Sequence, residues 1–341
     1  MMPRLRFVAA LGLAIAFSTP PAPAQSDPSD SADSADRADP TWSLTTIEPD
    51  PANGFEHPYL LYLPASVAGS GPIDLLVEPN NIGKPDDDVE VHREAAEHLA
   101  SQSSVGHLMS EWLGVPLLVP VFPRPMSDWQ TYTHALDEET MNVGQGPLHR
   151  LDLQLIAMID DARARLAEQG YEVGQRALFT GFSASGTFIN RFVMMHPDRV
   201  LAAAAGGLNG IVMLPVPEID GHRLPYPLGT DNLEQLTGAA FDLEAVNAVP
   251  QLYYMGAKDD NDAVQYDDAY SESERETIYA TIGQRMQPDR WEACQRLYRE
   301  HGLTATFQTF DHIGHGTDQT VFEAVMKFLA KARENATRSE P

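Results

Sequence analysis

Short, mainly apolar runs alternate with amphipathic stretches along most of the chain, and this alternation limits the possible folds more than any other feature. Apolar runs occur at Ile73 to Val77, Val115 to Val121 and Gln251 to Met255. The clearest amphipathic stretch runs from Leu151 to Leu166 and stops at Gly170. Apolar strands separated by helices are typical of a mostly parallel sheet with helices on both faces. The sequence therefore predicts an α/β fold.

The same pattern extends over residues 41–335, which we expect to form one domain, followed by a disordered tail at 336–341. The further strands expected are Trp42–Glu48, Pro58–Leu63, Arg176–Thr180, Val200–Ala205 and Thr304–Thr309. The further helices expected cover 86–101, 184–196, two stretches within 271–302, and 317–334. An insertion at 208–249 is rich in Pro, Gly and acidic residues, and both a lid and a passive crossover fit it.

The amino-terminal segment has the pattern of a secretory signal peptide. Arg4 and Arg6 precede an apolar run from Phe7 to Phe17, and Ala22-Pro23-Ala24 precedes Gln25. This apolar run is too short for a membrane span, which needs about 18 or more residues. We therefore expect a signal peptide at 1–24, a secreted or periplasmic protein, and no stable membrane insertion.

Residues 25–40 read QSDPSDSADSADRADP, an acidic low-complexity stretch that we interpret as a disordered linker. The whole chain carries 49 Asp and Glu against 23 Lys and Arg, a formal charge of −26. Such an acidic surface repels phosphate backbones, so we expect no nucleic-acid partner. Cys294 is the single cysteine, which excludes an intrachain disulfide and a cysteine-based zinc site.

The strongest catalytic motif is the sequence Gly181-Phe182-Ser183-Ala184-Ser185, which follows an apolar strand and enters a helix. A nucleophilic serine on a sharp strand-to-helix turn needs small residues two positions before and after it. Ser183 meets this requirement better than Ser185 does. The backbone N–H of Ala184 would lie at a helix N-terminus, where it can donate to an oxyanion. A helix-capping serine would give a similar pattern.

A serine nucleophile needs an acid and a histidine base, and here both follow expected strands. Asp259 comes three residues after the glycine that ends the strand 251–255, and Asp260 and Asp262 are its rivals. His315 lies in Gly314-His315-Gly316 after the last strand, and we prefer it to His312 because glycines flank it. The pair His312 and His315 has no third clustered ligand, so we expect no metal site.

With these three loops in this order, the chain resembles the α/β-hydrolase superfamily, closest to secreted bacterial esterases of the polyhydroxybutyrate-depolymerase and feruloyl-esterase type. The similarity lies in Pro58-Tyr-Leu-Leu-Tyr-Leu-Pro64, the Gly181–Gly186 turn and His196-Pro-Asp-Arg199. The resemblance implies the α/β-hydrolase fold, with Ser183 as nucleophile, Asp259 as acid and His315 as base.

The chain departs from this superfamily at Leu75–Gly83, where a His-Gly-Gly type loop often supplies a second oxyanion donor. The backbone N–H of Asn81 is the candidate here and Asn80 is the next, although the pair could simply form a polar turn. Trp129 and Tyr132 follow another strand and are candidates for binding the substrate, although loop aromatics often only pack.

The function expected from these motifs is that of a secreted serine hydrolase that cleaves small-molecule or polymeric carboxylic esters through an acyl-enzyme, without a cofactor. A serine peptidase or another acyl hydrolase on the same fold is the alternative, as is a non-catalytic exported binding protein.

Overall fold

The computed structural model describes residues 42–67 and 72–339. The expected signal peptide at 1–24 and the expected linker at 25–40 therefore lie outside the described residues. The same holds for the last two residues of the expected tail.

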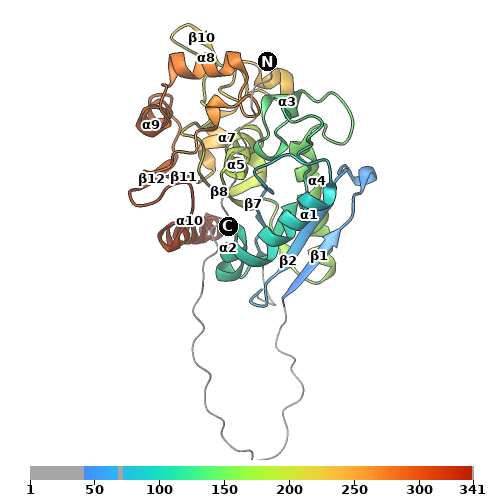
Figure 1. The fold of residues 1–341 in the computed structure, drawn as a ribbon. Coiled ribbons are helices and arrows are strands. Elements are labelled where there is room, and N and C mark those ends of the chain that lie inside the picture. Colours follow the sequence, from blue (N-terminus) through green and yellow to red (C-terminus); the bar gives the residue numbers. More distant parts are fainter. Residues whose placement is uncertain (1–41, 68–71, 340–341) are drawn as a thin grey trace, which may run out of the picture. The chain divides into compact units, whose positions relative to one another are not determined.

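A central sheet of eight strands organises the described part of the chain (Figure 1). The order across the sheet is β1-β2-β5-β4-β7-β8-β11-β12. Strand β2 pairs antiparallel with both of its neighbours, and the other pairs in this sheet are parallel. The strands are β1 (Ser43–Ile47), β2 (Tyr59–Leu63), β4 (Leu76–Val77), β5 (Leu117–Pro120), β7 (Ala177–Phe182), β8 (Val200–Gly206), β11 (Gln251–Gly256) and β12 (Thr306–Phe310).

Helices cover both faces of this sheet, as the alternation of the sequence predicted. Successive residues of a strand point to opposite faces, so Leu178 and Phe179 of β7 enter two different apolar cores. One core includes residues of α4 (Leu151–Glu168), α5 (Ala184–Met195), α8 (Glu272–Thr281) and α9 (Trp291–Glu300). The other includes residues of α1 (Val89–His98), α2 (Val105–Leu113) and α10 (Gln319–Ser339). The predicted mostly parallel α/β sheet is confirmed.

Three local predictions differ from the structure. Helix α2 lies between the expected helix 86–101 and the expected strand 115–121, where the sequence pattern predicts no element. The expected strand Ile73–Val77 is divided: β3 (Pro72–Ile73) pairs with β6 (Glu172–Val173), whereas β4 belongs to the central sheet. Helix α10 continues to Ser339, so residues 336–339, which belong to the expected disordered tail, are helical.

The insertion at 208–249 contains the hairpin of β9 (Glu218–Ile219) and β10 (His222–Arg223), followed by α6 (Leu233–Thr237) and α7 (Leu243–Ala248). Leu208, Leu214 and Tyr226 are fully buried and belong to one of the two apolar cores. Because these side chains help to form the core, the crossover interpretation fits this part of the insertion better than a separable lid.

The remaining short helices connect these elements: η1 (Pro51–Asn53), η2 (Leu99–Ser103), η3 (Thr133–Ala135), α3 (Glu138–Asn142), η4 (Pro197–Arg199), η5 (Ala263–Gln265) and η6 (Met286–Arg290). Within residues 42–67 and 72–339, no helix is both long and apolar enough to cross a membrane.

Candidate active site

Ser183 occupies a strained turn between β7 and α5. Its φ of 62° and ψ of −127° lie in a region that residues with a side chain rarely adopt. Such a conformation costs about 1–3 kcal/mol and persists only where the surroundings fix it. Here the Ser183 N–H donates to the Gly206 carbonyl at 2.8 Å, and the Ser183 carbonyl accepts from the Thr187 N–H at 3.0 Å. Hydrogen bonds to β8 on one side and within the first turn of α5 on the other therefore keep Ser183 in this conformation.

The small residues around Ser183 allow the strand and the helix to approach closely. A Cβ atom on Gly181 would lie 2.8 Å from the Ser185 Oγ, and one on Gly186 would lie 2.4 Å from the Gly206 carbonyl oxygen. The Ser185 hydroxyl accepts from the Phe182 N–H at 3.0 Å and donates to the Phe182 carbonyl at 2.9 Å. Ser185 thus stabilises the turn.

The three residues expected to form a catalytic triad lie together in the structure. The His315 Nε2 is 3.0 Å from the Ser183 Oγ, and the His315 Nδ1 is 2.9 Å from the Asp259 Oδ2. The Asp259 side chain is 1% exposed and the His315 side chain 23%, so the acid is enclosed while the imidazole remains accessible. A proton on Nδ1 would bind the carboxylate and leave the Nε2 lone pair free to accept the serine hydroxyl.

The acid and the histidine meet because their loops leave neighbouring parallel strands. Asp259 follows β11 and His315 follows β12. The Lys258 N–H donates to the Ile313 carbonyl at 2.9 Å, which joins the two loops directly. Gly256 is required at this junction, because a Cβ there would lie 2.4 Å from the carbonyl oxygens of Ile313 and Gly314.

The rival residues have other partners or face solvent. The Asp262 Oδ1 lies 2.5 Å from the Nη2 of Arg290, which is fully buried, and it also accepts from the Val264 N–H. Asp260 is exposed. The His312 Nε2 lies 2.7 Å from the Asp318 Oδ2. These contacts leave Asp259 and His315 as the pair that faces Ser183.

Asn261 also lies at this site, although no sequence motif singles it out. Its N–H donates to the Asp259 Oδ1 at 3.0 Å, and its Nδ2 lies 3.2 Å from the His315 Nε2. A polar residue two positions after an aspartate is common in turns, so the sequence alone carried only a weak signal.

The two backbone groups expected to bind an oxyanion are N–H groups at the turn after β7 and in the loop after β4. Within the described ranges, the N–H groups of Ala184 and Asn81 have no hydrogen-bond acceptor. The Asn81 Nδ2 donates to the Phe182 carbonyl at 3.4 Å, which links its loop to the turn that carries Ser183. The Asn80 side chain is fully buried and bonds both the N–H and the carbonyl of Phe122. The amide of Asn80 thus anchors the loop, and Asn81 is the better candidate donor.

Glu78 stands directly before this loop in the sequence. The residue is 3% exposed, and its carboxylate accepts from the Gly106 N–H at 3.0 Å, near the start of α2. Burial raises the pKa of Glu78 to about 7, while hydrogen bonds from Ser104 and Gly106 partly oppose the rise. A Cβ on Gly106 would lie 2.4 Å from the Glu78 Oε2, so this contact requires glycine.

The two aromatic candidates for substrate binding differ in their surroundings. Trp129 is 41% exposed. The Tyr132 ring lies 3.5 Å from the guanidinium carbon of Arg124, whose Nη2 donates to the Asp268 Oδ2 at 2.7 Å. Tyr132 thus already packs against a buried cation, and Trp129 is the more available of the two rings.

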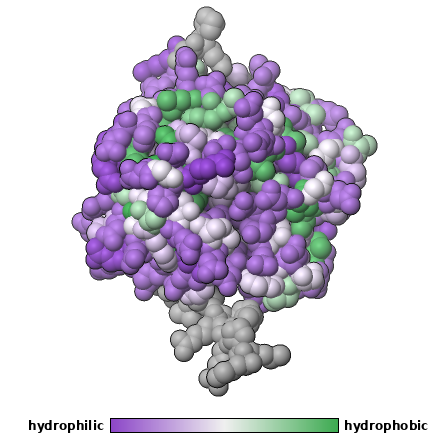
Figure 2. All heavy atoms as spheres, turned by 90° about the horizontal axis from the view of Figure 1, so that it is seen from above, coloured by the Kyte–Doolittle hydropathy of each residue, from purple (hydrophilic) through white to green (hydrophobic). Residues whose placement is uncertain are grey.

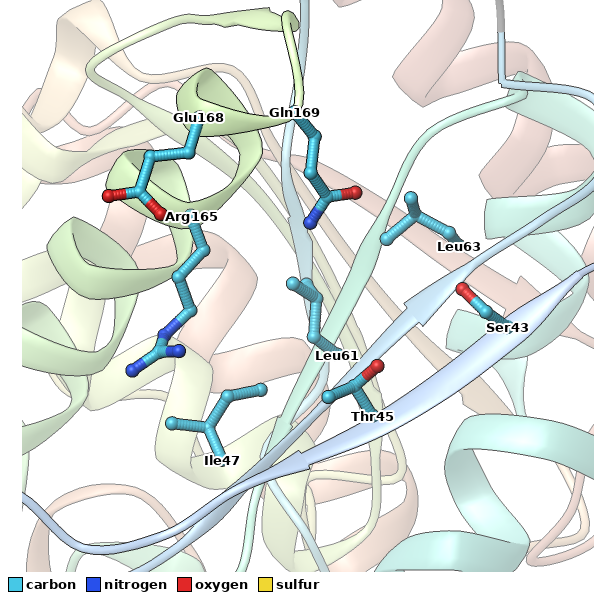
Figure 3. Close-up of a pocket in the computed structure, with 8 residues that line it drawn as sticks. All are labelled: Ser43, Thr45, Ile47, Leu61, Leu63, Arg165, Glu168 and Gln169. Carbon is cyan, nitrogen blue, oxygen red and sulfur yellow. The ribbon is translucent and has the colours of Figure 1, made fainter.

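A pocket of about 230 Å³ lies elsewhere, against the edge strand β1, strand β2 and the C-terminal end of α4 (Figure 3). Ile47, Leu61 and Arg165 are among its lining residues. None of the candidate catalytic residues lines it, so it belongs to a different part of the molecule from Ser183. The described residues contain no group of His, Cys, Asp and Glu side chains that could hold a metal ion.

Comparisons with known proteins bear on the fold. No protein-family model matches the chain, and no curated protein gives a significant match. Among solved structures, poly(aspartic acid) hydrolase-1 from Sphingomonas sp. KT-1 is similar, with a TM-score of 0.50 and 17% identity over 84% of this chain and 98% of that one. LpqC, a poly(3-hydroxybutyrate) depolymerase from Bordetella parapertussis, gives a TM-score of 0.49 and 17% identity over 85% of this chain and 89% of that one.

The sheet, its covering helices and the first of these similarities define the class. The protein has the α/β-hydrolase fold, as the sequence resemblance implied. Ser183 follows the fifth strand along the chain in the central sheet, Asp259 the seventh and His315 the eighth. Identities this low show a shared fold, so what the chain does has to be argued from its own residues.

Proposed function

We propose that the protein is a serine hydrolase that cleaves carboxylic esters, with Ser183 as nucleophile, His315 as general base and Asp259 as the acid that orients the histidine. The observation that carries the proposal is the pair of contacts made by His315, 3.0 Å to the Ser183 Oγ and 2.9 Å to the Asp259 Oδ2. The serine of this hydrogen-bonded series lies in a strained turn at the start of a helix, where its hydroxyl can reach a bound carbonyl.

In the acylation step, the Ser183 Oγ attacks the carbonyl carbon of the ester while its proton moves to the His315 Nε2. The negative charge that develops on the carbonyl oxygen is stabilised by the N–H groups of Ala184 and Asn81. The imidazolium then gives its proton to the leaving alcohol oxygen as the C–O bond breaks. Asp259 is enclosed and negatively charged in this mechanism, so it stabilises the imidazolium without taking its proton.

In the deacylation step, a water molecule attacks the acyl carbon and transfers a proton to the His315 Nε2. The bond from the acyl carbon to the Ser183 Oγ breaks, the proton returns to Oγ, and a carboxylic acid leaves. The protein supplies the base and the oxyanion donors in both steps, and the proposal includes no cofactor.

The substrate class is a small-molecule or polymeric ester, for which the exposed ring of Trp129 offers a contact surface. The similarity to a poly(aspartic acid) hydrolase fits hydrolysis of an acyl bond, and it does not choose between ester and amide. A peptidase or another acyl hydrolase would use the same triad, so amide substrates belong in the test.

We also propose that the protein is exported, with cleavage of the signal peptide between Ala24 and Gln25. The support is the sequence of charged, apolar and small residues that precedes Gln25. Expression of the full chain in a bacterial host, followed by fractionation and amino-terminal sequencing, tests this. The expected product begins at Gln25 outside the cytoplasm, and a cytoplasmic product that begins at Met1 would contradict export.

The activity test compares the wild type with S183A on short and medium p-nitrophenyl esters and on the matched p-nitroanilides. Loss of the nucleophile should lower kcat by about 10⁴-fold or more, because removal of a triad member leaves only binding and oxyanion stabilisation. The matched control is S273A, since Ser273 is an exposed serine of α8. It should retain wild-type activity and melting temperature.

A fluorophosphonate should label the wild type on Ser183 alone, as peptide mass spectrometry can establish. Unchanged ester hydrolysis by S183A would overturn the proposal. Faster cleavage of anilides than of esters would favour the peptidase alternative. If the wild type shows neither hydrolytic activity nor labelling, this would favour a non-catalytic binding protein.

A further inference from the structure

Asn261 places a second polar group beside the nitrogen that takes part in proton transfer. Its Nδ2 is 3.2 Å from the His315 Nε2, and the Ser183 Oγ is 3.0 Å from the same atom. A neutral imidazole nitrogen presents one lone pair, so the amide and the hydroxyl compete for it. The orientation of the ring is already fixed at Nδ1 by Asp259. The amide is therefore not needed to hold the resting histidine.

The backbone around Asn261 is fixed on both sides. Its own N–H donates to the Asp259 Oδ1, the carboxylate oxygen that His315 leaves free. The next residue, Asp262, pairs with the fully buried Arg290 and accepts from the Val264 N–H. The amide group of Asn261 is thus held next to Nε2 by the same loop that positions the acid.

The amide of Asn261 can take part in the reaction once Ser183 is acylated. The Oγ then has no proton to donate, and the space next to Nε2 must receive the water that attacks the acyl carbon. A water molecule is oriented when both of its protons have acceptors. The Nε2 is one acceptor, and a half-turn of the amide about χ2 brings the Asn261 Oδ1 to the place of Nδ2 as the other.

We propose that Asn261 is a further catalytic residue, which orients the hydrolytic water in deacylation. One proton of the water goes to the His315 Nε2, the other stays on oxygen and is held by the Asn261 Oδ1, and the lone pair attacks the acyl carbon. The bond to the Ser183 Oγ breaks and the imidazolium proton passes to Oγ, so the released acid and the free enzyme balance the step. The inference rests on the proposed function.

The experiment is stopped-flow hydrolysis of p-nitrophenyl acetate by the wild type, N261A and N261D. The rate of the initial burst reports acylation, and the later steady rate reports deacylation. The p-nitrophenolate leaves without help, so N261A should keep the burst rate within about twofold and lower the steady rate by about tenfold or more. Intact mass spectrometry should show acetylated N261A accumulating during turnover.

N261D tests the acceptor directly, since a carboxylate has no N–H but keeps an oxygen in the same place. It should restore the steady rate to within about threefold of the wild type. The matched control is Q265A, because Gln265 is an exposed amide of the same loop, whose Nε2 donates to the Asp262 carbonyl. It should match the wild type in both phases.

Equal slowing of the burst and of the steady rate in N261A would indicate a structural role for Asn261 and overturn the proposal. An unchanged steady rate in N261A would also overturn it. So would a steady rate in N261D as slow as that of N261A. If N261A fails to fold, N261S carries the test, because a serine side chain is too short to reach the water. Failure of the proposed function itself looks different: the wild type then does not hydrolyse the ester and shows no acetylated Ser183.

Discussion

At the scale of single residues, Glu78 is unusual because it is an acid buried directly before the loop that carries Asn80 and Asn81. In the folded chain its pKa is about 7, against 4.5 for an unperturbed glutamate. The native state therefore binds the Glu78 proton more tightly than the unfolded state does. It follows that Glu78 stabilises the fold most fully below pH 4.5 and that this contribution is lost as the pH rises through 7.

We expect E78Q to show this dependence, because glutamine keeps an oxygen for the Gly106 N–H and does not ionise. Between pH 5 and pH 8, the free energy of unfolding of E78Q should gain about 2 kcal/mol relative to the wild type. Urea unfolding of both proteins at the two pH values measures the change. E94Q, at an exposed position of α1, is the control. If the free energies of unfolding of E78Q and the wild type differ by the same amount at both pH values, Glu78 has the same pKa in the folded and the unfolded state.

At the scale of elements, the contact between α5 and β8 fixes where Ser183 sits. Gly186 of α5 faces Gly206 of β8 so closely that a Cβ would lie 2.4 Å from its carbonyl oxygen and 3.1 Å from its nitrogen. Both are backbone atoms of a central strand, which cannot move aside as a flexible side chain can.

G186A should therefore destabilise the protein, although alanine favours a helix over glycine by about 1 kcal/mol. We expect a loss of about 1–3 kcal/mol, the usual cost of overpacking, together with lower esterase activity as α5 is pushed away from β8. Chemical denaturation and p-nitrophenyl ester assays measure both effects. The matched control is G144A, because a Cβ at Gly144 meets no atom within 4 Å. If G186A is as stable as G144A, the backbones of α5 and β8 can move apart without a measurable loss of stability.

The sequence predicted most of the central sheet and the three loops of the candidate site, because each is a local pattern. The strand before Gly181, the helix after Ala184 and the glycines beside His315 can all be recognised within a few residues. Helix α2 was missed although it carries a signal: Ser104 caps its start, and apolar residues follow at helical spacing.

Other features depend on partners that are distant in the sequence. Arg124 pairs with Asp268, and nothing near either residue indicates the other. Asn261 is next to Nε2 only because β12 places His315 beside the loop that follows β11. The pairing of β11 with β12 could be expected from the fold class, whereas the contact of one amide with one ring nitrogen requires the folded structure.

At the scale of the whole molecule, the formal charge of −26 makes self-repulsion a general cost of folding. Figure 2 shows a face covered largely by hydrophilic residues, with hydrophobic ones in smaller groups. Salt screens repulsion between exposed charges, with a Debye length that falls from about 30 Å at 0.01 M to about 8 Å at 0.15 M.

We expect the melting temperature to rise by several degrees between 0.01 M and 0.5 M sodium chloride, because the excess of like charges outweighs the exposed ion pairs that salt also weakens. Differential scanning calorimetry at fixed pH measures the shift. Sodium and potassium chloride should act alike if screening is the cause. A melting temperature that falls with salt would mean that ion pairs, such as Arg285 with Asp289, dominate the balance.

The position of β12 at the edge of the sheet has a consequence for when the protein can act. The strand pairs with β11 on one side, and its middle residues are partly exposed, so we expect local unfolding to detach it before the other parallel strands. His315 follows it, 132 positions after Ser183. Under the proposed mechanism, a chain still emerging from the ribosome carries its nucleophile long before its base. The serine is inert until His315 has been synthesised and placed beside it, and heating should inactivate the enzyme by detaching this edge strand before the core melts.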